Sequence, residues 1–286
     1  MDTDMRTIQP DNFPARLREI EDVPDKLYMR GPGFPDASRY LCVVGSRKHT
    51  TYGKDMCKKI ITGLAGSSIC IVSGLALGMD AIAHKAALAA NLPCVAVPGS
   101  GLNEDVLYPR TNLPLAKKIL AAGGTLVSEF EPDQGGASWT FPQRNRIMAG
   151  LAHAVLVVEA TEDSGTLITA GLAADFNRDL FTVPGSIKSD NTTGPHQLIR
   201  DGAALIRSGE DIRKEFGLED LANNAKSQAA DLSAEEQKII DELTEPRKKD
   251  ELVASVDLPA NRINVLISQL ELKGVIQESS GKVERV

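Results

Sequence analysis

The stretch LCVVGSRK at residues 41–48 decides the fold of this chain. Its four apolar residues predict a buried strand that ends at Gly45, and a helical pattern over residues 52–64 follows at once. In an open α/β sheet, ligands bind at the carboxyl ends of the parallel strands. Backbone N–H groups at a glycine turn and at a helix N-terminus favour an anion there, and the planar guanidinium of Arg47 suits phosphate. We therefore expect this turn to bind a phosphate group.

The same pattern recurs along the chain as short apolar runs, each followed by a stretch with helical period. Continuous apolar character predicts strands that are buried on both faces, as in a parallel sheet covered by helices. The alternation of strands and helices predicts a doubly wound, mostly parallel α/β fold. The runs are residues 41–44, 69–72, 94–97, 125–128, 154–160 and 180–183, with a weaker one at 203–206.

The two ends of the chain have a different character. The first forty residues are rich in proline and predict an irregular lead-in packed on the core. Near the other end, Ser233 begins three short helical patterns, and a hairpin turning at Ser280-Gly281 follows them, which together predict a small winged-helix domain. The expected domains are the lead-in 1–40, a Rossmann-like domain 41–218, a linker 219–230 and a winged helix 231–286.

Composition sets the class of protein. The 286 residues are 42% hydrophobic and carry 32 Lys and Arg against 39 Asp and Glu, a net charge of −7. That charge argues against a surface coated with basic residues but leaves room for a local basic cleft. The N-terminus is polar, no apolar run approaches the ~20 residues of a membrane helix, and the four cysteines lie in apolar runs. We expect a cytoplasmic protein with reduced, buried thiols and no membrane partner.

Five loops that follow the predicted strands share glycine, serine and threonine. Glycine lets a backbone approach a ligand closely, and hydroxyl groups donate to phosphate oxygens. One such loop can be explained as a tight turn between a strand and a helix, which commonly contains glycine. Five that converge on one sheet edge favour a shared anionic ligand. The candidate contacts from these loops are Gly45, Ser46, Arg47, Gly99, Ser100, Gly101, Gly165 and Thr166.

A sixth element, TFPQRNR at residues 140–146, places two arginines near a predicted helix N-terminus. Arginine opposes the helix dipole there, so a phosphate, Asp163 or Glu159 is expected to relieve the cost; the alternative is a solvated basic turn. Phe141 could stack on a base or fill the core. Further candidates from this region and its surroundings are Arg144, Asn145, Arg146 and Arg110, and His84 is expected to pair with Asp80 as a buried, loop-orienting couple.

The sequence lacks the motifs of several enzyme classes. The first loop is GSRKHT rather than the GxGxxG of a dinucleotide site, and no Walker A, HExxH or GxSxG motif occurs. A hydrolase of the lysine-decarboxylase-like type would carry PGGxGTxxE, but Thr169 stands where its glutamate belongs. We therefore expect a non-catalytic binding protein without cofactor or metal. The alternative is a nucleotide-binding sensor or N-glycoside hydrolase that uses Glu159, Glu162 or Asp163.

From about residue 12 to its end, the chain resembles the DNA-processing protein A family (DprA, also called Smf). The resemblance rests on VVGSRKHTTYG, IVSGLALGMDAIAHKAAL, VAVPGSGLNEDVLYPRTN, LVSEF, FPQRNRIMAGL, VLVVEATEDSGTLITAGLA and FTVPGSI. It implies an extended Rossmann domain that binds single-stranded DNA, forms homodimers and loads RecA recombinase onto the strand during natural transformation, without an established catalytic activity.

Carried over by position, the resemblance makes Ser46, Arg47, Arg110, Phe141, Arg144, Asn145, Arg146 and the Gly165-Thr166 turn contacts for DNA. Two departures stand out. Some relatives have a basic residue just before FPxRNR, where this chain has Ser138-Trp139-Thr140, so that contact is expected to be either missing or replaced by stacking on Trp139. The N-terminal helical domain of many members is not expected here, because the chain opens close to the core.

The predicted winged helix is acidic. Residues 231–286 hold eight Lys and Arg against twelve Asp and Glu, a net charge of −4. Neutralisation of phosphates supplies most non-specific affinity for DNA, so this composition is poorly suited to duplex binding. It disfavours a transcription regulator and favours a module for protein contacts or regulation.

Overall fold

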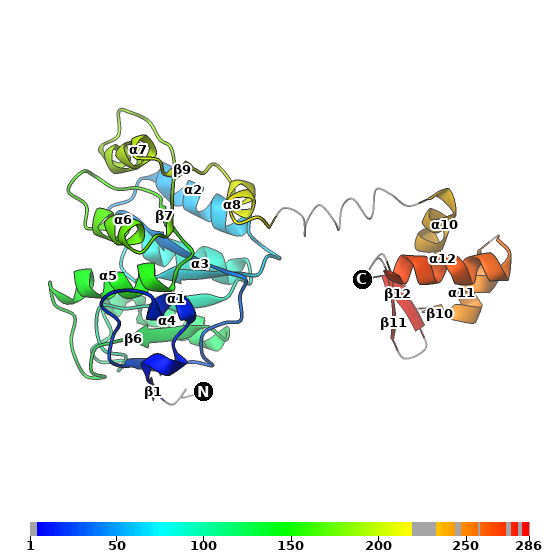
Figure 1. Cartoon of the computed structure of the whole chain (residues 1–286), viewed down its shortest axis with the longest axis horizontal. Helices are drawn as coiled ribbons and strands as arrows, with labels where there is room; N and C mark the ends of the chain where they lie inside the picture. Colours follow the sequence, from blue (N-terminus) through cyan, green and yellow to red (C-terminus); the bar gives the residue numbers. More distant parts are fainter. Residues whose placement is uncertain are drawn as a thin grey trace. The chain divides into compact units, whose positions relative to one another are not determined.

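In the computed structural model of the chain, the opening stretch belongs to β3 (Arg39–Val44), an inner strand of a nine-stranded sheet (Figure 1). The strand order is β1-β2-β6-β5-β4-β3-β7-β8-β9, and β3 to β9 are parallel. The structure describes residues 5–218, 233–243, 247–256, 258–272, 276–279 and 282–285. The other strands are β4 (Ile69–Ser73), β5 (Cys94–Ala96), β6 (Thr125–Ser128), β7 (Ala154–Val157), β8 (Asp179–Thr182) and β9 (Ala204–Leu205). All seven predicted runs are therefore parallel strands, which confirms the predicted fold class.

Helices cover both faces of this sheet. On one face, α3 packs against α2, α4 and β3, and α8 packs on α2; on the other, α5 packs against α1, α6 and β3. The bounds are α1 (Ala15–Arg18), α2 (Thr51–Thr62), α3 (Met79–Ala89), α4 (Leu113–Ala121), α5 (Thr140–Leu151), α6 (Thr166–Asp175), α7 (Thr193–Arg200) and α8 (Gly209–Glu215), with short 3₁₀ turns η1 (Pro10–Asn12), η2 (Arg110–Asn112) and η3 (Asp190–Thr192).

The core explains the continuous apolar character of the strands. Cys42 and Val44 pack with Met148 of α5 and Ala170 of α6. Leu41 and Val43 belong to the same strand and are equally inaccessible. Because successive side chains point to opposite faces, burial of all four requires helices on both sides of β3.

The lead-in is more regular than predicted. β1 (Arg6–Ile8) pairs antiparallel with β2 (Leu27–Arg30), and β2 pairs antiparallel with β6, so two strands extend the sheet at this edge. Leu27, Tyr28 and Met29 are buried. The expectation of an irregular segment was wrong. An apolar run of only three residues between polar neighbours is too short to be recognised as a strand before its pairing partner is known.

The chain divides into two compact units, Met1–Phe216 and Gly217–Val286. The second contains α10 (Ala234–Glu242), α11 (Lys249–Ser255), α12 (Ala260–Leu272), β10 (Arg247–Lys248), β11 (Ile276–Ser279) and β12 (Lys282–Arg285). The strands form an antiparallel sheet in the order β10-β12-β11. The predicted winged helix is confirmed, with β10 as an additional strand; the expected linker 219–230 and the turn residues Ser280-Gly281 lie outside the described residues.

The start of α10 follows the predicted capping chemistry. The Ser233 hydroxyl accepts the Glu236 N–H at 3.2 Å, and the Glu236 carboxylate accepts the Ser233 N–H at 2.7 Å. This reciprocal pair satisfies two N–H groups that the helix itself cannot. Within the part of the chain that the structure describes, no helix combines the length and the apolar character needed to cross a membrane.

Candidate functional site

A pocket of about 590 Å³ lies beyond the carboxyl ends of β3 and β7. These two strands are neighbours, yet the chain leaves β3 toward β4 on one side and leaves β7 toward β8 on the other. The loops that follow them therefore diverge and open a crevice, which is where ligands bind in doubly wound sheets. The position agrees with the expectation from the opening stretch.

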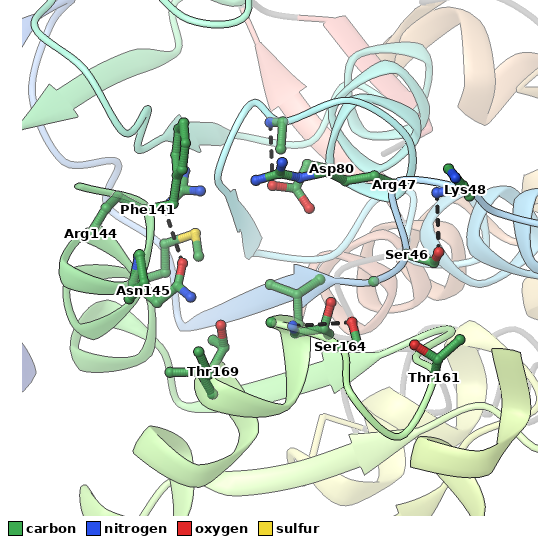
Figure 2. Close-up of a pocket in the computed structure, with 18 of the residues that line it drawn as sticks. Ser46, Arg47, Lys48, Asp80, Phe141, Arg144, Asn145, Thr161, Ser164 and Thr169 are labelled. Atoms are coloured by element: carbon green, nitrogen blue, oxygen red, sulfur yellow. Dashed lines mark hydrogen bonds between the residues drawn. The ribbon is translucent and has the colours of Figure 1, made fainter. Parts of the chain in front are cut away.

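Three segments that are distant in sequence face this pocket (Figure 2). The loop after β3 supplies Ser46, Arg47 and Lys48. The segment after β7 and the start of α6 supply Thr161, Ser164 and Thr169, and α5 supplies Phe141, Arg144 and Asn145. Asp80, in the first turn of α3, contributes a carboxylate.

The backbone of the turn after β3 is used within the protein. The Ser46 N–H donates to the Glu159 carbonyl at 2.8 Å, and the Lys48 N–H donates to the Ser46 hydroxyl at 3.1 Å. A Cβ atom on Gly45 would lie 2.8 Å from Met79 Cγ, so only glycine allows α3 to approach this closely. The Ser46 and Lys48 amides are thus engaged, and the side chains carry more of the anion-binding potential than the sequence predicted.

Arg47 and Lys48 are the exposed cations of the pocket. Neither side chain has an ion-pair or hydrogen-bond partner among the described residues. Arg47 Cζ lies 5.2 Å from the centroid of the Phe141 ring, a cation–π contact that holds the guanidinium at the pocket wall. Two positive groups are therefore available to a ligand.

The start of α6 adds a further attraction for anions. The helix begins at Thr166, directly after Gly165, and the Ser164 hydroxyl accepts the Thr166 N–H at 3.2 Å. The positive end of a ten-residue helix thus borders the pocket, together with several hydroxyl groups. Negative ligands are favoured at such a helix terminus.

Arg144 is buried at the base of this pocket and is held by oxygen atoms of the protein. Its Nη1 donates to the Gly74 carbonyl at 2.5 Å and to the Val97 carbonyl, and its Nε donates to Asn145 Oδ1 at 3.2 Å. Burial lowers the pKa of Arg144, and the charge of nearby Asp80 opposes that shift. The negative group expected near this arginine is therefore Asp80, rather than Asp163 or Glu159.

The carboxylate of Asp80 organises the loop after β4. Its Oδ2 accepts the N–H groups of Gly74 at 3.1 Å and of Ala76 at 3.3 Å. Burial raises the pKa of Asp80, while Arg144 and these N–H groups act in the opposite direction. The expected pair with His84 does not form, because both ring nitrogens of His84 are buried without a hydrogen-bond partner.

The two arginines of TFPQRNR have different environments. Arg146 is buried away from the pocket lining, with Nη2 2.5 Å from Glu129 Oε2 and Nε 2.9 Å from Asp22 Oδ2. Residues two apart on an α-helix are separated by about 200° around its axis. Arg144 and Arg146 therefore point to opposite sides of α5, and the geometry gives Arg146 a role in an ion pair.

The loop at residues 98–103 also lies outside the pocket lining. Ser100 is buried, and its hydroxyl donates to the Gly101 carbonyl at 3.1 Å and accepts the Tyr108 N–H at 3.0 Å. Cβ atoms would lie 2.5 Å from the Phe141 ring at Gly99 and 2.2 Å from the Glu131 carbonyl at Gly101. These three expected contacts therefore form a tightly packed support.

Arg110 is exposed and likewise absent from the lining, with Nη1 donating to the Asp105 carbonyl at 2.9 Å. Of the thirteen predicted site residues, the structure brings together Gly45, Ser46, Arg47, Phe141, Arg144, Asn145, Gly165 and Thr166. It does not bring Gly99, Ser100, Gly101, Arg110 or Arg146 into that group.

Several lining residues were missed. Lys48 ended the opening stretch, and its charge was the signal that could have found it. Asn191 gave no signal in the sequence, because it lies 143 residues after Lys48 and reaches the pocket only in the folded chain. Its Nδ2 donates to the Lys48 carbonyl at 3.0 Å. The hydroxyl-bearing residues Thr161 and Ser164 lie in the segment after β7, and Thr169 lies in α6. The glycine of this segment was recognised, but none of these three residues was chosen as a ligand contact.

Glu159, a candidate acid for hydrolysis, has another role. Its carboxylate accepts the Thr50 N–H at 2.9 Å and the Thr50 hydroxyl at 2.5 Å, at the start of α2. It does not line the pocket. Among the described residues, no group of three or more His, Cys, Asp or Glu side chains could hold a metal ion.

Comparison with known proteins gives this fold and site a family. The family model described as DNA recombination-mediator protein A matches residues 4–217, and that of the DprA winged helix domain matches residues 223–282. The chain is 43% identical to Protein Smf of Escherichia coli over 208 residues, which are 72% of this chain and 55% of that protein. It is 41% identical to DNA processing protein DprA of Streptococcus pneumoniae over 214 residues, 73% of each protein. The match thus spans little more than half of the E. coli relative.

Solved structures agree. The structure of DprA from Streptococcus pneumoniae has a TM-score of 0.67 at 38% identity, covering 74% of each chain. DNA processing protein A from Helicobacter pylori, studied for its single-stranded DNA binding mode, has a TM-score of 0.67 at 28% identity, covering 75% of this chain and 96% of that one. From its sequence, its sheet and its winged helix, the chain belongs to the DNA recombination-mediator protein A family.

Proposed function

We propose that this chain binds single-stranded DNA, without catalysis, in the pocket beyond β3 and β7, and that it acts in natural transformation and recombination. The observation that carries the proposal is the pair of exposed cations, Arg47 and Lys48, beside the N-terminus of α6 in a chain whose net charge is −7; among the described residues neither has an ion-pair or hydrogen-bond partner. Positive groups concentrated in one crevice fit a polyanion. The single-stranded DNA binding mode studied in the Helicobacter pylori relative supports the choice of ligand.

In the proposed complex, phosphates lie against Arg47, Lys48 and the start of α6, and a base stacks on the exposed part of Phe141. Phosphate contacts position a strand but carry no sequence information, and stacking tolerates every base. Binding should therefore show weak sequence preference. Arg144 and Asp80 hold the shape of the pocket from behind rather than gripping the strand.

The test compares single-stranded with duplex oligonucleotides in a mobility-shift titration of the intact protein at several salt concentrations. Arg47→Ala should weaken binding of all single strands and lower the slope of log K against log salt by about 0.7, because one phosphate contact is lost. Arg207→Ala is the matched control: this arginine is exposed, is paired with Asp211 and lies outside the pocket lining. Unchanged titrations for Arg47→Ala would refute the pocket as the DNA site.

We further propose that two copies associate and that the complex loads RecA recombinase onto the bound strand. The match to a recombination-mediator family supports this role. A dimer places two pockets on one strand, so a copy unable to associate should bind long oligonucleotides much less tightly through loss of avidity. Sedimentation of the protein, with and without RecA and a single strand, measures both associations.

A second candidate is a nucleotide-binding sensor or N-glycoside hydrolase in the same pocket. The observation in its favour is the carboxylate of Asp80, which lines a pocket of about 590 Å³, within the range of small-molecule sites. Incubation with nucleoside monophosphates, followed by chromatography for released base, separates the two functions. Release that disappears in Asp80→Asn would favour the hydrolase.

A further inference from the structure

A second pocket, of about 350 Å³, lies at the opposite edge of the sheet, where β3, β7 and β8 begin. We call it the amino-edge pocket. Apart from Phe216, its lining residues are polar: Arg16, Arg39, His153, Asn177, Asp179 and Glu215. Ligands of doubly wound sheets bind at the carboxyl ends of the strands, so the pocket beyond β3 and β7 does not account for this cluster.

Two arginines of the amino-edge pocket are not neutralised by carboxylates. Among the residues that the structure describes, neither Arg16 nor Arg39 forms an ion pair, and the Arg39 guanidinium donates only to the Ser38 carbonyl, at 2.9 Å. A third, Arg178, is buried and held by Glu19 at 3.3 Å and by the Arg16 carbonyl at 2.8 Å. Arg178 therefore supports the fold, whereas the guanidinium groups of Arg16 and Arg39 are available to a ligand.

His153 adds a neutral hydrogen-bond donor to this cluster. Its Nδ1 accepts the Tyr40 N–H at 3.0 Å, so the neutral ring carries its proton on Nε2. Burial and the charges of the three arginines lower the pKa of His153 to about 4. Burial also lowers the pKa of Arg16, and the charges of the other two arginines act in the same direction. An anion bound among these groups would offset their mutual repulsion.

The carboxylates of the pocket restrict the kind of anion. Asp179 and Glu215 are exposed, and neither forms an ion pair with any described residue. With His153 neutral, two arginines and two carboxylates leave the lining without net charge, which gives a long polyanion little attraction. Carboxylates of this kind accept hydrogen bonds from sugar hydroxyls. A ligand with one phosphate and several hydroxyl groups therefore fits, and the volume lies in the range of small-molecule sites.

We propose that the amino-edge pocket binds a small phosphorylated sugar, either free or as part of a nucleotide. The phosphate lies against the guanidinium groups of Arg16 and Arg39 and accepts the Nε2–H of His153. The sugar hydroxyls donate to Asp179 and Glu215. The site goes beyond the proposed function and does not depend on it, because no residue lines both pockets.

The experiment is a calorimetric titration of the intact protein with ribose 5-phosphate, inorganic phosphate and ribose at low ionic strength. Ribose 5-phosphate should bind more tightly than phosphate, and ribose should not bind measurably, because charged hydrogen bonds supply most of the affinity. Arg39→Ala should weaken ribose 5-phosphate by about tenfold or more. Arg16→Ala tests the same contact from α1 should Arg39→Ala fold poorly.

Two further variants and one further probe define the ligand. Arg18→Ala is the matched control, since Arg18 is an exposed arginine of the same helix as Arg16 and lies outside the lining. Asp179→Ala should weaken ribose 5-phosphate but not inorganic phosphate, which has no sugar hydroxyls. Tighter binding of adenosine 5′-monophosphate than of ribose 5-phosphate would identify a nucleotide as the ligand, and weaker binding a free sugar phosphate.

The His153 ring gives a second measurement by proton NMR. Saturation with ribose 5-phosphate should raise the pKa of His153 above its value of about 4, because the phosphate offsets the three guanidinium groups. The chain has four histidines, and His153→Gln identifies the signal. An unchanged pKa at saturation would place the phosphate elsewhere and overturn the inference.

The outcomes also separate this site from the DNA pocket. Arg39→Ala should bind single strands as the wild type does, and Arg47→Ala should bind ribose 5-phosphate as the wild type does. Loss of ribose 5-phosphate binding in Arg47→Ala but not in Arg39→Ala would assign that ligand to the DNA pocket and overturn the inference. Equal affinities for phosphate and ribose 5-phosphate would overturn the proposed class of ligand, since the sugar would then make no contact.

Discussion

Three arginines of this chain show how surroundings decide the role of one side chain. Arg47 is exposed and has no hydrogen-bond partner among the described residues, Arg144 is buried against backbone carbonyls, and Arg146 is buried against Glu129. An exposed guanidinium can bind an external anion, whereas a buried one held against oxygen atoms of the protein is not available to a ligand. Only Arg47 is therefore expected to contribute mainly to binding.

The first prediction concerns Arg146. Arg146→Ala should lower the free energy of unfolding by about 3–5 kcal/mol, because the largely buried Glu129 loses its partner. The pKa of Glu129 is already raised by burial, and loss of the arginine should raise it further. Denaturant unfolding measures the change in stability.

The affinity of Arg146→Ala for single strands, measured well below its unfolding temperature, should equal that of the wild type. The double variant Arg146→Met with Glu129→Leu serves as control and should recover part of the stability, since no buried charge is left unpaired; Asp22, the other partner of Arg146, is exposed to solvent. Normal stability combined with weak DNA binding would instead restore Arg146 to the binding site.

The second prediction concerns His84, whose pKa is lowered to about 4 by burial. Its usual value is near 6.5, so between pH 6.5 and 4 the unfolded chain binds a proton that the folded chain does not. Stability therefore falls as pH falls through this window, by about 3 kcal/mol from this group. His84→Leu should remove that contribution.

The measurement is the difference in the free energy of unfolding between His84→Leu and the wild type at pH 7 and at pH 4. Taking the difference cancels the carboxylates and His153, whose pKa is also lowered to about 4. Relative to the wild type, the free energy of unfolding of His84→Leu should be about 3 kcal/mol higher at pH 4 than at pH 7. A pH-independent gap would show that His84 titrates normally in the folded protein.

At the scale of elements, the start of α2 is held by a residue that follows β7, the strand next to β3. Glu159, after β7, accepts both the N–H and the hydroxyl of Thr50, and the Thr50 hydroxyl accepts the Gly53 N–H at 3.0 Å. A negative group at a helix N-terminus is stabilising. This clamp joins the two strand ends that frame the pocket.

The third prediction tests the clamp through Gly53. A Cβ atom there would lie 2.2 Å from Glu159 Cδ, so Gly53→Ala should lower the unfolding temperature although alanine is the better helix former. Gly171→Ala in α6 is the matched control, because a Cβ atom there meets nothing within 4 Å. It should raise stability by up to about 1 kcal/mol. Stabilisation by both substitutions would mean that Glu159 moves aside without cost.

At the scale of the molecule, the pocket and the acidic winged helix belong to different units. Every residue that lines the pocket belongs to the first unit, Met1–Phe216. Residues 231–286 carry a net charge of −4. A negative module contributes little to the binding of a polyanion and repels it weakly at low salt.

The fourth prediction follows from this division. A chain ending at residue 218 should bind short single strands with nearly the affinity of the full chain, since no pocket residue is lost. Fluorescence anisotropy with a labelled oligonucleotide of about ten residues, too short for the avidity of two pockets, measures this. A loss as large as that expected for Arg47→Ala would show that the winged helix takes part in binding the strand.

The sequence alone determined the order and type of the main elements and the edge of the sheet where the pocket lies. Apolar runs buried on both faces and helical periods are local signals, so the existence and order of β3 to β9 and the N-cap at Ser233 could be predicted, with strand bounds that differ from the observed ones by up to three residues. The winged helix followed from the same periods. The fold class needed nothing beyond these patterns.

Only the tertiary structure decided which candidate side chains meet. Helical spacing separates Arg144 from Arg146, but their partners at Gly74, Val97 and Glu129 decide which side of α5 faces the pocket. In the lead-in, β2 pairs with β6, a hundred residues away, and β1 pairs with β2. Such contacts depend on how distant segments of the chain fold against one another, and a local sequence pattern carries no information about that arrangement. The position of the pocket could therefore be predicted from the sequence, but its lining residues only in part.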